Sequence, residues 1–386
     1  MKNQFSLNLS SVPKELKLII EIIKIEEEKG IQEISEDLLE NINWEEFLQL
    51  AMHHRVYSLL YSRMNKTSKI PSEVVQSLNR KYQKNIFKML SLSGEMEQIC
   101  RIFGESQIKS LVLKGPVLAA DLYGDLSLRT SRDLDILIPF KDLSKADQVL
   151  TNLGYEKEEL QTLFNDWKWK DHHISYYHPK KQMHIEIHWK MHPGASKEPD
   201  FKELWARKRT CTHFSHSVYF LGREDLFLFL ALHGARHGWS RLRWLIDIHQ
   251  LMKQNLNWDE IFALSKKYKS TQVEEQALIL SSQLLNSYLP KTVKVRSWKL
   301  AQSAIFYYER MINLHNGDPL PLKLERYHMM YLMSLKSLSS KFLFIISFLF
   351  PTYKDKETLK LPRTFYFLYF PLRPVLVTVR KITSLK

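Results

Sequence analysis

Cysteine is almost absent from this sequence: Cys100 and Cys211 are the only two in 386 residues. Two thiols cannot build the disulfide framework that stabilises many small secreted proteins. The N-terminal segment also lacks the apolar core of a secretory signal, because Lys17, Glu21 and Lys24 interrupt its aliphatic residues. We therefore expect a cytoplasmic protein.

Long apolar runs are missing as well, and a helix that spans a bilayer needs about 20 such residues. The strongly apolar segments 342–350 and 365–370 are each far shorter than this. No low-complexity linker marks a domain boundary, although 386 residues with 44% hydrophobic content exceed most single domains. The chain is therefore expected to form two or three packed units.

The hydrophobic pattern that is present divides the chain into four parts. Apolar residues first recur at helical spacing, then alternate as in strands, and then return to helical spacing. The parts are an N-terminal helical region (1–104), an α/β core (105–220), a C-terminal helical domain (221–335) and a basic aromatic tail (336–386). The fold class is thus α+β, with a mixed sheet flanked by helical regions. In the first part, helices are predicted at 13–29, 44–64 and 72–103.

Two aspartates, one residue apart, lie on a short strand predicted at 133–138. Because successive side chains of a strand point to opposite faces, Asp133 and Asp135 share one face while the apolar residues face a core. Two carboxylates held this close repel each other unless one is protonated or a cation neutralises both. Mg²⁺ suits such a pair, since it binds one or two carboxylates and completes its shell with water and phosphate.

A short apolar strand at 110–114 precedes the turn Gly115-Pro116 and a helical run at 117–123. Glycine at such a turn lets backbone N–H groups approach an anion, and the N-terminus of the next helix favours negative charge. This unit predicts a phosphate site.

A third carboxylate comes from the segment 183–189, where apolar residues alternate with His184, Glu186 and His188. The preceding segment 174–178 and a turn-prone connection predict a hairpin with it. Placed beside the aspartate strand, Glu186 would complete a cluster of three carboxylates.

These residues together resemble bacterial nucleotidyltransferase family proteins of the DNA polymerase β-like nucleotidyltransferase superfamily. The resemblance is carried by Lys114-Gly115, Tyr123-Gly124-Asp125, Arg129, Arg132, Asp133-Leu134-Asp135-Ile136 and Glu186-Ile187-His188-Trp189. It implies a polymerase β-like nucleotidyltransferase core with a mixed sheet. One departure is Pro116, because the superfamily usually has Gly or Ser after the turn glycine.

The resemblance also implies roles for individual residues. The catalytic residues, which would bind two Mg²⁺ or Mn²⁺ ions, are Asp133, Asp135 and Glu186. The nucleotide-binding residues are Lys114, Gly115, Arg129 and Arg132. The implied reaction moves a nucleoside monophosphate from an NTP such as ATP to an unidentified acceptor (a small molecule, a peptide or RNA) and releases pyrophosphate.

Two other interpretations of the sequence stay open. One is a catalytically degenerate binding protein with the same fold, and the other is a protein that binds or modifies tRNA. A net charge of +14 and a pI near 9.4 suit a polyanion, yet no recognisable RNA-binding motif is present. The aromatic tail, which carries ten Lys or Arg against two acids, either packs on preceding helices or contacts an anionic membrane peripherally.

Two further groups of polar residues have alternative interpretations. His53, His54 and Arg55 either reach a nucleotide or form a solvated or capping face. His233 and His237 have a zinc-like spacing but lack the glutamate and cysteine neighbours of zinc sites, so zinc is not expected. With the nearby charged residues they either line the active site or satisfy one another within a helical domain; these neighbours are Arg241, Arg243 and Asp247.

Overall fold

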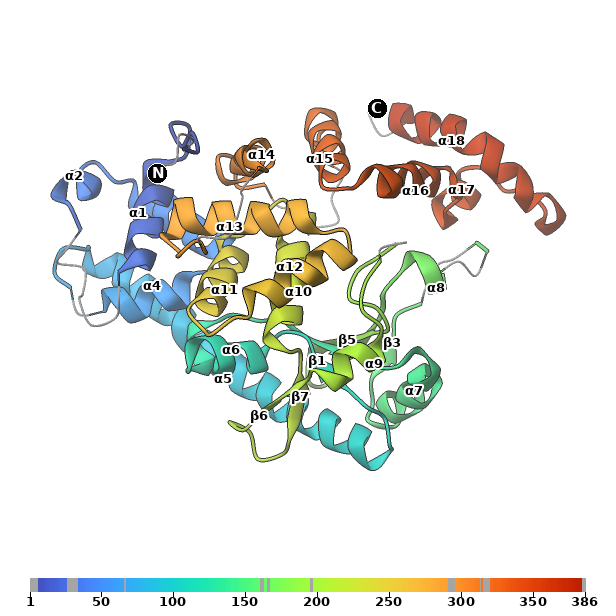
Figure 1. The fold of residues 1–386 in the computed structure, drawn as a ribbon, viewed down its shortest axis with the longest axis horizontal. Helices are drawn as coiled ribbons and strands as arrows, with labels where there is room; N and C mark the ends of the chain where they lie inside the picture. The colour runs from blue at the N-terminus through green and yellow to red at the C-terminus, as the bar shows by residue number, and fades with distance from the viewer. Residues whose placement is uncertain are drawn as a thin grey trace.

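The computed structural model places a mixed sheet among many helices (Figure 1). It describes residues 6–25, 34–65, 67–159, 163–164, 167–194, 197–290, 296–312, 314 and 320–383. The predicted α+β class with a mixed sheet is therefore confirmed at this level. The element bounds of the first helical region are α1 (Lys14–Lys24), α2 (Glu36–Leu39), α3 (Trp44–His53), α4 (Tyr57–Met64) and α5 (Ser72–Glu105).

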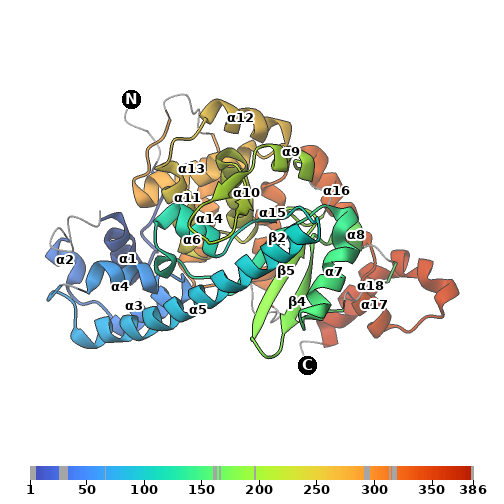
Figure 2. The ribbon, with the colours of Figure 1, turned by 90° about the horizontal axis from the view of Figure 1, so that it is seen from below.

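The longest described helix, α5, extends over 34 residues and runs past both the helical region and the sheet (Figure 2). It contacts α4, α6, α7 and β2, so it connects the N-terminal helices to the site-bearing strand. The prediction of a long helix at 72–103 is confirmed. Helix α1 accounts for part of the helix predicted at 13–29, and residues 26–29 lie outside the described part.

The single helix predicted at 44–64 is wrong, because the chain breaks between α3 and α4. Arg55 adopts a left-handed backbone conformation with a φ of 56°, which ends α3. At this break His54 is buried, and its Nδ1 accepts a hydrogen bond of 3.1 Å from the backbone N–H of Leu242. A tertiary contact from a distant helix therefore overrides the local helical pattern.

The sheet has seven described strands in the order β3-β4-β5-β2-β1-β7-β6. Strand β2 pairs antiparallel with β1 and parallel with β5, and β4 and β5 form the predicted hairpin. The strands are β1 (Leu111–Val112), β2 (Asp133–Leu137), β3 (Glu156–Lys157), β4 (His173–His178), β5 (Met183–His188), β6 (Arg209–Cys211) and β7 (Val218–Phe220).

Short helices connect the strands (Figure 1). Gly124, in a left-handed conformation, ends α6. The helices are α6 (Pro116–Tyr123), α7 (Leu143–Asn152), α8 (Trp167–Lys170) and α9 (Phe201–Ala206).

The C-terminal helices pack against each other and against the N-terminal region. Helices α10, α11 and α13 contact one another, and α1 also packs on α13, so a single hydrophobic core extends from Leu7 to Tyr308. Helices α3 and α12 start alike, since the side chains of Asn43 and Asn257 both cap the following turn. The helices are α10 (Arg223–Arg236), α11 (Leu242–Met252), α12 (Trp258–Lys267), α13 (Thr271–Leu285) and α14 (Trp298–Tyr308).

The tail forms a small helical unit at one edge of the molecule (Figure 1). Asp355 is fully buried there, and Arg373 and Arg380 both form ion pairs with its carboxylate. Among the described residues, no helix combines the length and the apolar character needed to cross a membrane. The last helices are α15 (Leu322–Ser334), α16 (Leu338–Leu349), α17 (Tyr353–Thr358) and α18 (Tyr369–Thr383).

Candidate active site

The parallel pairing of β2 with β5 brings the predicted carboxylates together. Asp135 lies opposite Glu186 in the register, and Asp133 lies opposite His184. Directly opposed residues on adjacent strands extend to the same face and are close enough to interact. Asp133 shares this face with Asp135, because they are two residues apart on β2. The hairpin therefore delivers Glu186 to the position that the sequence predicts.

Strand β2 is buried on both of its faces, apart from the partly buried Asp133. Leu134, Ile136 and Ile138 have no exposed surface, as expected for the core face. On the opposite face Leu137 is buried too, and Asp135 is only 1% exposed. The carboxylate of Asp135 is therefore removed from solvent.

Lys114 neutralises part of this buried charge. Its ammonium lies 2.9 Å from Oδ1 of Asp135, and it comes from the residue that directly precedes the glycine turn. The backbone N–H of Leu113 donates to the Asp135 carbonyl at 2.8 Å, which aligns the end of β1 with the middle of β2. Lys114 therefore lies beside the aspartates, and its contact with a nucleotide phosphate stays a prediction.

His188 is a central site residue to which the sequence analysis gave no role. Its Nε2 lies 3.3 Å from Oδ1 of Asp135 and 3.2 Å from Oε2 of Glu186. The signal was available, because His188 follows Glu186 by two residues on the same strand and therefore faces the same side. Its burial depends on the packing around the sheet, which no local pattern reveals.

The pKa shifts separate the two aspartates. Burial, the charge of Asp135 and the charge of Glu186 raise the pKa of Asp133, and Lys114 only partly opposes them. Burial would also raise the pKa of Asp135, but Lys114 and His188 outweigh it and lower that pKa well below its usual range. Asp135 is therefore the carboxylate held firmly in its charged form.

The remaining members of the cluster form a coupled acid–imidazole pair. Burial opposes ionisation of Glu186, yet the hydrogen bond with His188 lowers the pKa of its carboxyl. Burial likewise opposes protonation of His188, but its bonds to Asp135 and Glu186 raise the pKa of the ring. The carboxylates of Asp135 and Glu186 therefore favour a positive group between them, here the imidazole of His188.

The donor atoms fit a divalent cation. One oxygen each from Asp135 and Glu186 and one nitrogen of His188 all lie within 4.8 Å of one another. Oδ2 of Asp135 accepts no hydrogen bond from any described residue, although it is buried. A buried carboxylate oxygen without a donor is costly unless a cation binds it.

Further imidazoles and one guanidinium lie beside Glu186. His173 Nε2 is 3.8 Å from Oε1 of Glu186, and the nitrogens of His172, His173 and His188 also lie within 4.8 Å of one another. Burial is the main cause that lowers the pKa of His173 to about 4, so its ring is neutral at pH 7. Arg236 donates to His172 at 3.5 Å.

The predicted glycine turn adjoins the carboxylates. Gly115 has a φ of 81° and a ψ of −141°, a combination that L side chains rarely adopt. A Cβ at this position would lie 3.7 Å from the backbone oxygen of Asp133 and 4.0 Å from Oγ of Ser131. Pro116 occupies the first helical position of α6, where the missing N–H removes no helical hydrogen bond.

Arg129 has a supporting position behind this turn. Its guanidinium forms two hydrogen bonds of 2.9 Å with the carboxylate of Asp247, and its side chain is 1% exposed. Nη1 also approaches the Gly115 carbonyl at 3.5 Å, and Tyr123 donates to Asp247 at 2.8 Å. Three of its five N–H donors are engaged in this way, so Arg129 supports the turn, and its contact with a nucleotide phosphate stays a prediction.

Arg132 differs from Arg129, because it is exposed at the residue that enters β2. The polar residues of α10 and α11 had two alternatives, to line the active site or to satisfy one another within a helical domain, and they are divided between the two. Asp247 and Arg243 bind residues in the approach to β2, whereas His233 and His237 contact each other and Trp244 within the helical region.

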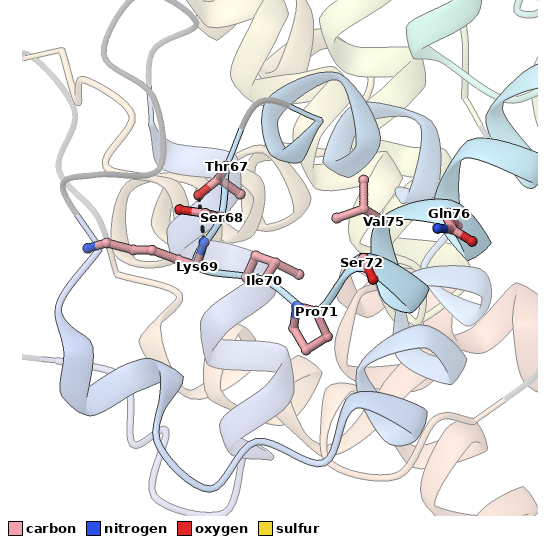
Figure 3. A pocket seen from close by; sticks show the side chains of 8 residues that line it. All are labelled: Thr67, Ser68, Lys69, Ile70, Pro71, Ser72, Val75 and Gln76. Atoms are coloured by element: carbon pink, nitrogen blue, oxygen red, sulfur yellow. Dashed lines mark hydrogen bonds between the residues drawn. The ribbon is translucent and has the colours of Figure 1, made fainter.

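A surface hollow lies elsewhere, at the loop that leads into α5 (Figure 3). A hydrogen bond of 3.2 Å from the Lys69 backbone to Thr67 shapes this loop. None of the carboxylates or histidines of the candidate site lines it. The lining residues are Thr67, Ser68, Lys69, Ile70, Pro71, Ser72, Val75 and Gln76.

Comparison with known proteins gives one family match. Among solved structures, the chain is similar to a nucleotidyltransferase-like antigenic protein from Paracoccidioides brasiliensis, at 14% identity, covering 52% of this chain and 94% of that one. The TM-score of that comparison is 0.30. No match was found among curated proteins. The model of a family described as uncharacterised nucleotidyltransferase matches residues 40–286. Since this is more than half of the chain, the protein belongs to that nucleotidyltransferase family.

Proposed function

We propose that this protein is a metal-dependent nucleotidyltransferase with a polymerase β-like core, of the bacterial type that its sequence resembles. It moves a nucleoside monophosphate from an NTP to an acceptor and releases pyrophosphate. The supporting observation is the placement of Asp135 opposite Glu186 on adjacent parallel strands, with Asp133 on the same face and the Gly115 turn beside them. The family match supports nucleotidyl transfer as the general activity.

In the proposed reaction an acceptor oxygen attacks the α-phosphorus, and the bond to pyrophosphate breaks as the new O–P bond forms. Two divalent cations, held by Asp133, Asp135 and Glu186, would lower the pKa of the acceptor and neutralise the leaving group. Lys114 provides a fixed positive charge between the glycine turn and Asp135. His188 orients both Asp135 and Glu186 through its Nε2.

The cation proposed is Mg²⁺ or Mn²⁺, because carboxylates dominate the donor set. Glu186→Gln tests this assignment, with His184→Gln as the control two residues earlier on β5, where the side chain is 53% exposed. Mn²⁺ binding followed by electron paramagnetic resonance should weaken at least tenfold in Glu186→Gln and stay unchanged in His184→Gln. Equal Mn²⁺ affinity in both variants would exclude Glu186 as a ligand.

The reaction type is tested with each of the four NTPs labelled at either the α- or the γ-phosphate. The protein, Mg²⁺ or Mn²⁺, and separate pools of small metabolites, peptides and tRNA are incubated together. We expect the α-label alone to enter one acceptor pool, and Asp135→Asn to abolish this transfer. Transfer of the γ-label would indicate a kinase. Absence of any NTP binding in equilibrium dialysis would instead favour a degenerate binding protein.

A further inference from the structure

Five cationic side chains surround the segment that enters β2, and we call them the basic cluster. They come from four separate parts of the fold: the α3–α4 break, α5, the residue before Asp133, and the start of α11. They are Arg55, Lys88, Arg132, Arg241 and Arg243.

Hydrogen bonds donated by side chains, mostly to backbone carbonyls, hold this cluster in place. Arg243 donates to the carbonyl and, at 3.1 Å, to the hydroxyl of Thr130, two residues before Arg132. Arg241 donates to the carbonyl of His53 at 2.7 Å, which fixes the α3–α4 break against α11. On the other side, Asn85 of α5 donates to the carbonyls of Ser127 and Arg129 at 2.8 and 3.3 Å. The segments that carry the cluster are thus fixed to one another by the fold.

Four of the five positive charges of the cluster lack a carboxylate partner among the described residues. None of Arg55, Lys88, Arg132 and Arg243 forms an ion pair with a described carboxylate. The buried Nε atoms of Arg55 and Arg243 also donate to no described acceptor. Unpaired guanidinium groups that are removed from water destabilise a fold unless an anion binds them.

The directions of the pKa shifts indicate that these charges act on one another. Burial, followed by Arg241 and Arg132, lowers the pKa of Arg55 to about 10, and Asp133 opposes this shift. Burial and the nearby guanidinium groups lower the pKa of Arg243 to about 9. Asp133 acts on Arg55, Lys88 and Arg243, which places the cluster directly beside the carboxylate site.

The depth of the cluster favours a compact anion. Arg241 and Arg243 are only 6% and 9% exposed, whereas Lys88 and Arg132 are exposed at its rim. Arginine binds phosphate oxygens in a bidentate fork, and lysine adds a point charge. A flexible chain of phosphates can contact both the exposed and the more buried cations, while the backbone of a nucleic-acid duplex contacts mainly exposed cations.

We propose that the basic cluster binds the polyphosphate end of the nucleotide, which leaves as pyrophosphate. This inference rests on the proposed function, but it assigns residues outside the carboxylate site, mainly from the helical regions. It also orients the substrate: the β- and γ-phosphates extend from Asp133 toward the α3–α4 break. The arginines hold these phosphates through charge-assisted hydrogen bonds.

The test measures binding of sodium tripolyphosphate by isothermal titration calorimetry in EDTA, so that neither a cation nor catalysis is needed. The double variant Lys88→Gln/Arg132→Gln changes only exposed rim residues. The control Lys145→Gln/Lys202→Gln removes the same charge from exposed residues of α7 and α9. We expect at least tenfold weaker binding in the first variant and less than a twofold change in the control.

A second measurement separates this proposal from its alternatives. The rim variant should lose affinity for an NTP but not for the matching nucleoside monophosphate. Equal tripolyphosphate binding by the rim variant and the unchanged protein would overturn the proposal, and so would loss of tRNA binding alone. If Asp135→Asn abolishes transfer but tripolyphosphate binding persists, both proposals stand. If no transfer is found but the cluster binds tripolyphosphate, only the proposed function fails.

Discussion

Asp133 and Asp135 are chemically alike and two residues apart, yet they lie in opposite electrostatic environments. Asp135 has Lys114 at 2.9 Å and His188 at 3.3 Å, which favour its charged form. The pKa of Asp133 is raised by burial and by its two carboxylate neighbours. A like-charge argument from the strand alone treats the two aspartates as equivalent, and the structure shows that they are not.

This asymmetry predicts different stabilities for the two amide variants in EDTA at pH 7. Asp135→Asn leaves Lys114 without its partner and should lower the free energy of unfolding by about 3 kcal/mol. Asp133→Asn removes an unfavourable charge and should leave that free energy unchanged or slightly higher. Urea unfolding followed by circular dichroism measures both. Equal losses in the two variants would contradict the asymmetry.

At the scale of elements, the site depends on one turn with unusual backbone geometry. Gly115 has a positive φ, and this lets β1 turn sharply into α6 beside Asp133. Gly94, by contrast, is an exposed glycine within α5, and a Cβ there would meet nothing within 4 Å. The two glycines therefore provide a matched comparison of a turn and a helix.

Gly115→Ala should destabilise the protein by about 1–3 kcal/mol, because alanine does not adopt this backbone conformation without strain. Gly94→Ala should stabilise it by about 0.5–1 kcal/mol, because alanine restricts the unfolded chain and favours the helix. Thermal unfolding of both variants checks the opposite signs. A stabilised Gly115→Ala variant would show that the turn is not constrained as described.

The helical core contains a buried acid that makes stability depend on pH. Burial raises the pKa of Glu274, on α13, to about 7 from a usual value of 4.5, and Oε2 has no described hydrogen-bond partner. The folded state therefore holds the proton more tightly than the unfolded state. As pH rises from 4.5 through 7, the stability contributed by this proton is lost.

Glu274→Gln removes this ionisation and should change how stability varies with pH. At pH 8 the variant should be more stable than the unchanged protein by up to about 3 kcal/mol, from 1.36 kcal/mol per pKa unit. Near pH 4.5 the two proteins should be similar. Calorimetric melting between pH 4.5 and 8 measures the difference, and a difference that does not grow with pH would contradict the assignment.

At the scale of the whole molecule, the C-terminal unit presents apolar side chains to solvent. Phe342 on α16 is 66% exposed and Phe367 is 61% exposed, although Tyr369 in the same unit is fully buried. The expectation that the tail aromatics simply pack on preceding helices is therefore met only in part. The exposed aromatic side chains and the net charge of +8 over residues 336–386 suit an anionic surface. We therefore propose that this unit contacts an anionic membrane peripherally.

Liposome flotation tests this contact. The full chain should float with liposomes that contain anionic lipid at low salt, and it should detach as salt is raised. Phe342→Ser/Phe367→Ser should abolish flotation, whereas Phe87→Ser/Leu90→Ser, which changes two exposed apolar residues of α5, should not. If the full chain stays unbound with anionic liposomes at low salt, the membrane proposal is wrong.

The sequence by itself determined the elements that carry the candidate site. Alternation on β2 and β5 placed the three carboxylates on single strand faces, and Gly115 and Gly124 marked the two ends of α6, because these are local properties of the backbone. Only the tertiary structure decided which groups face them. The position of His188 between two carboxylates, the pairing of Arg129 with Asp247 and the break at Arg55 each depend on contacts between distant segments. Such contacts fix burial and charge environment, which local periodicity does not encode.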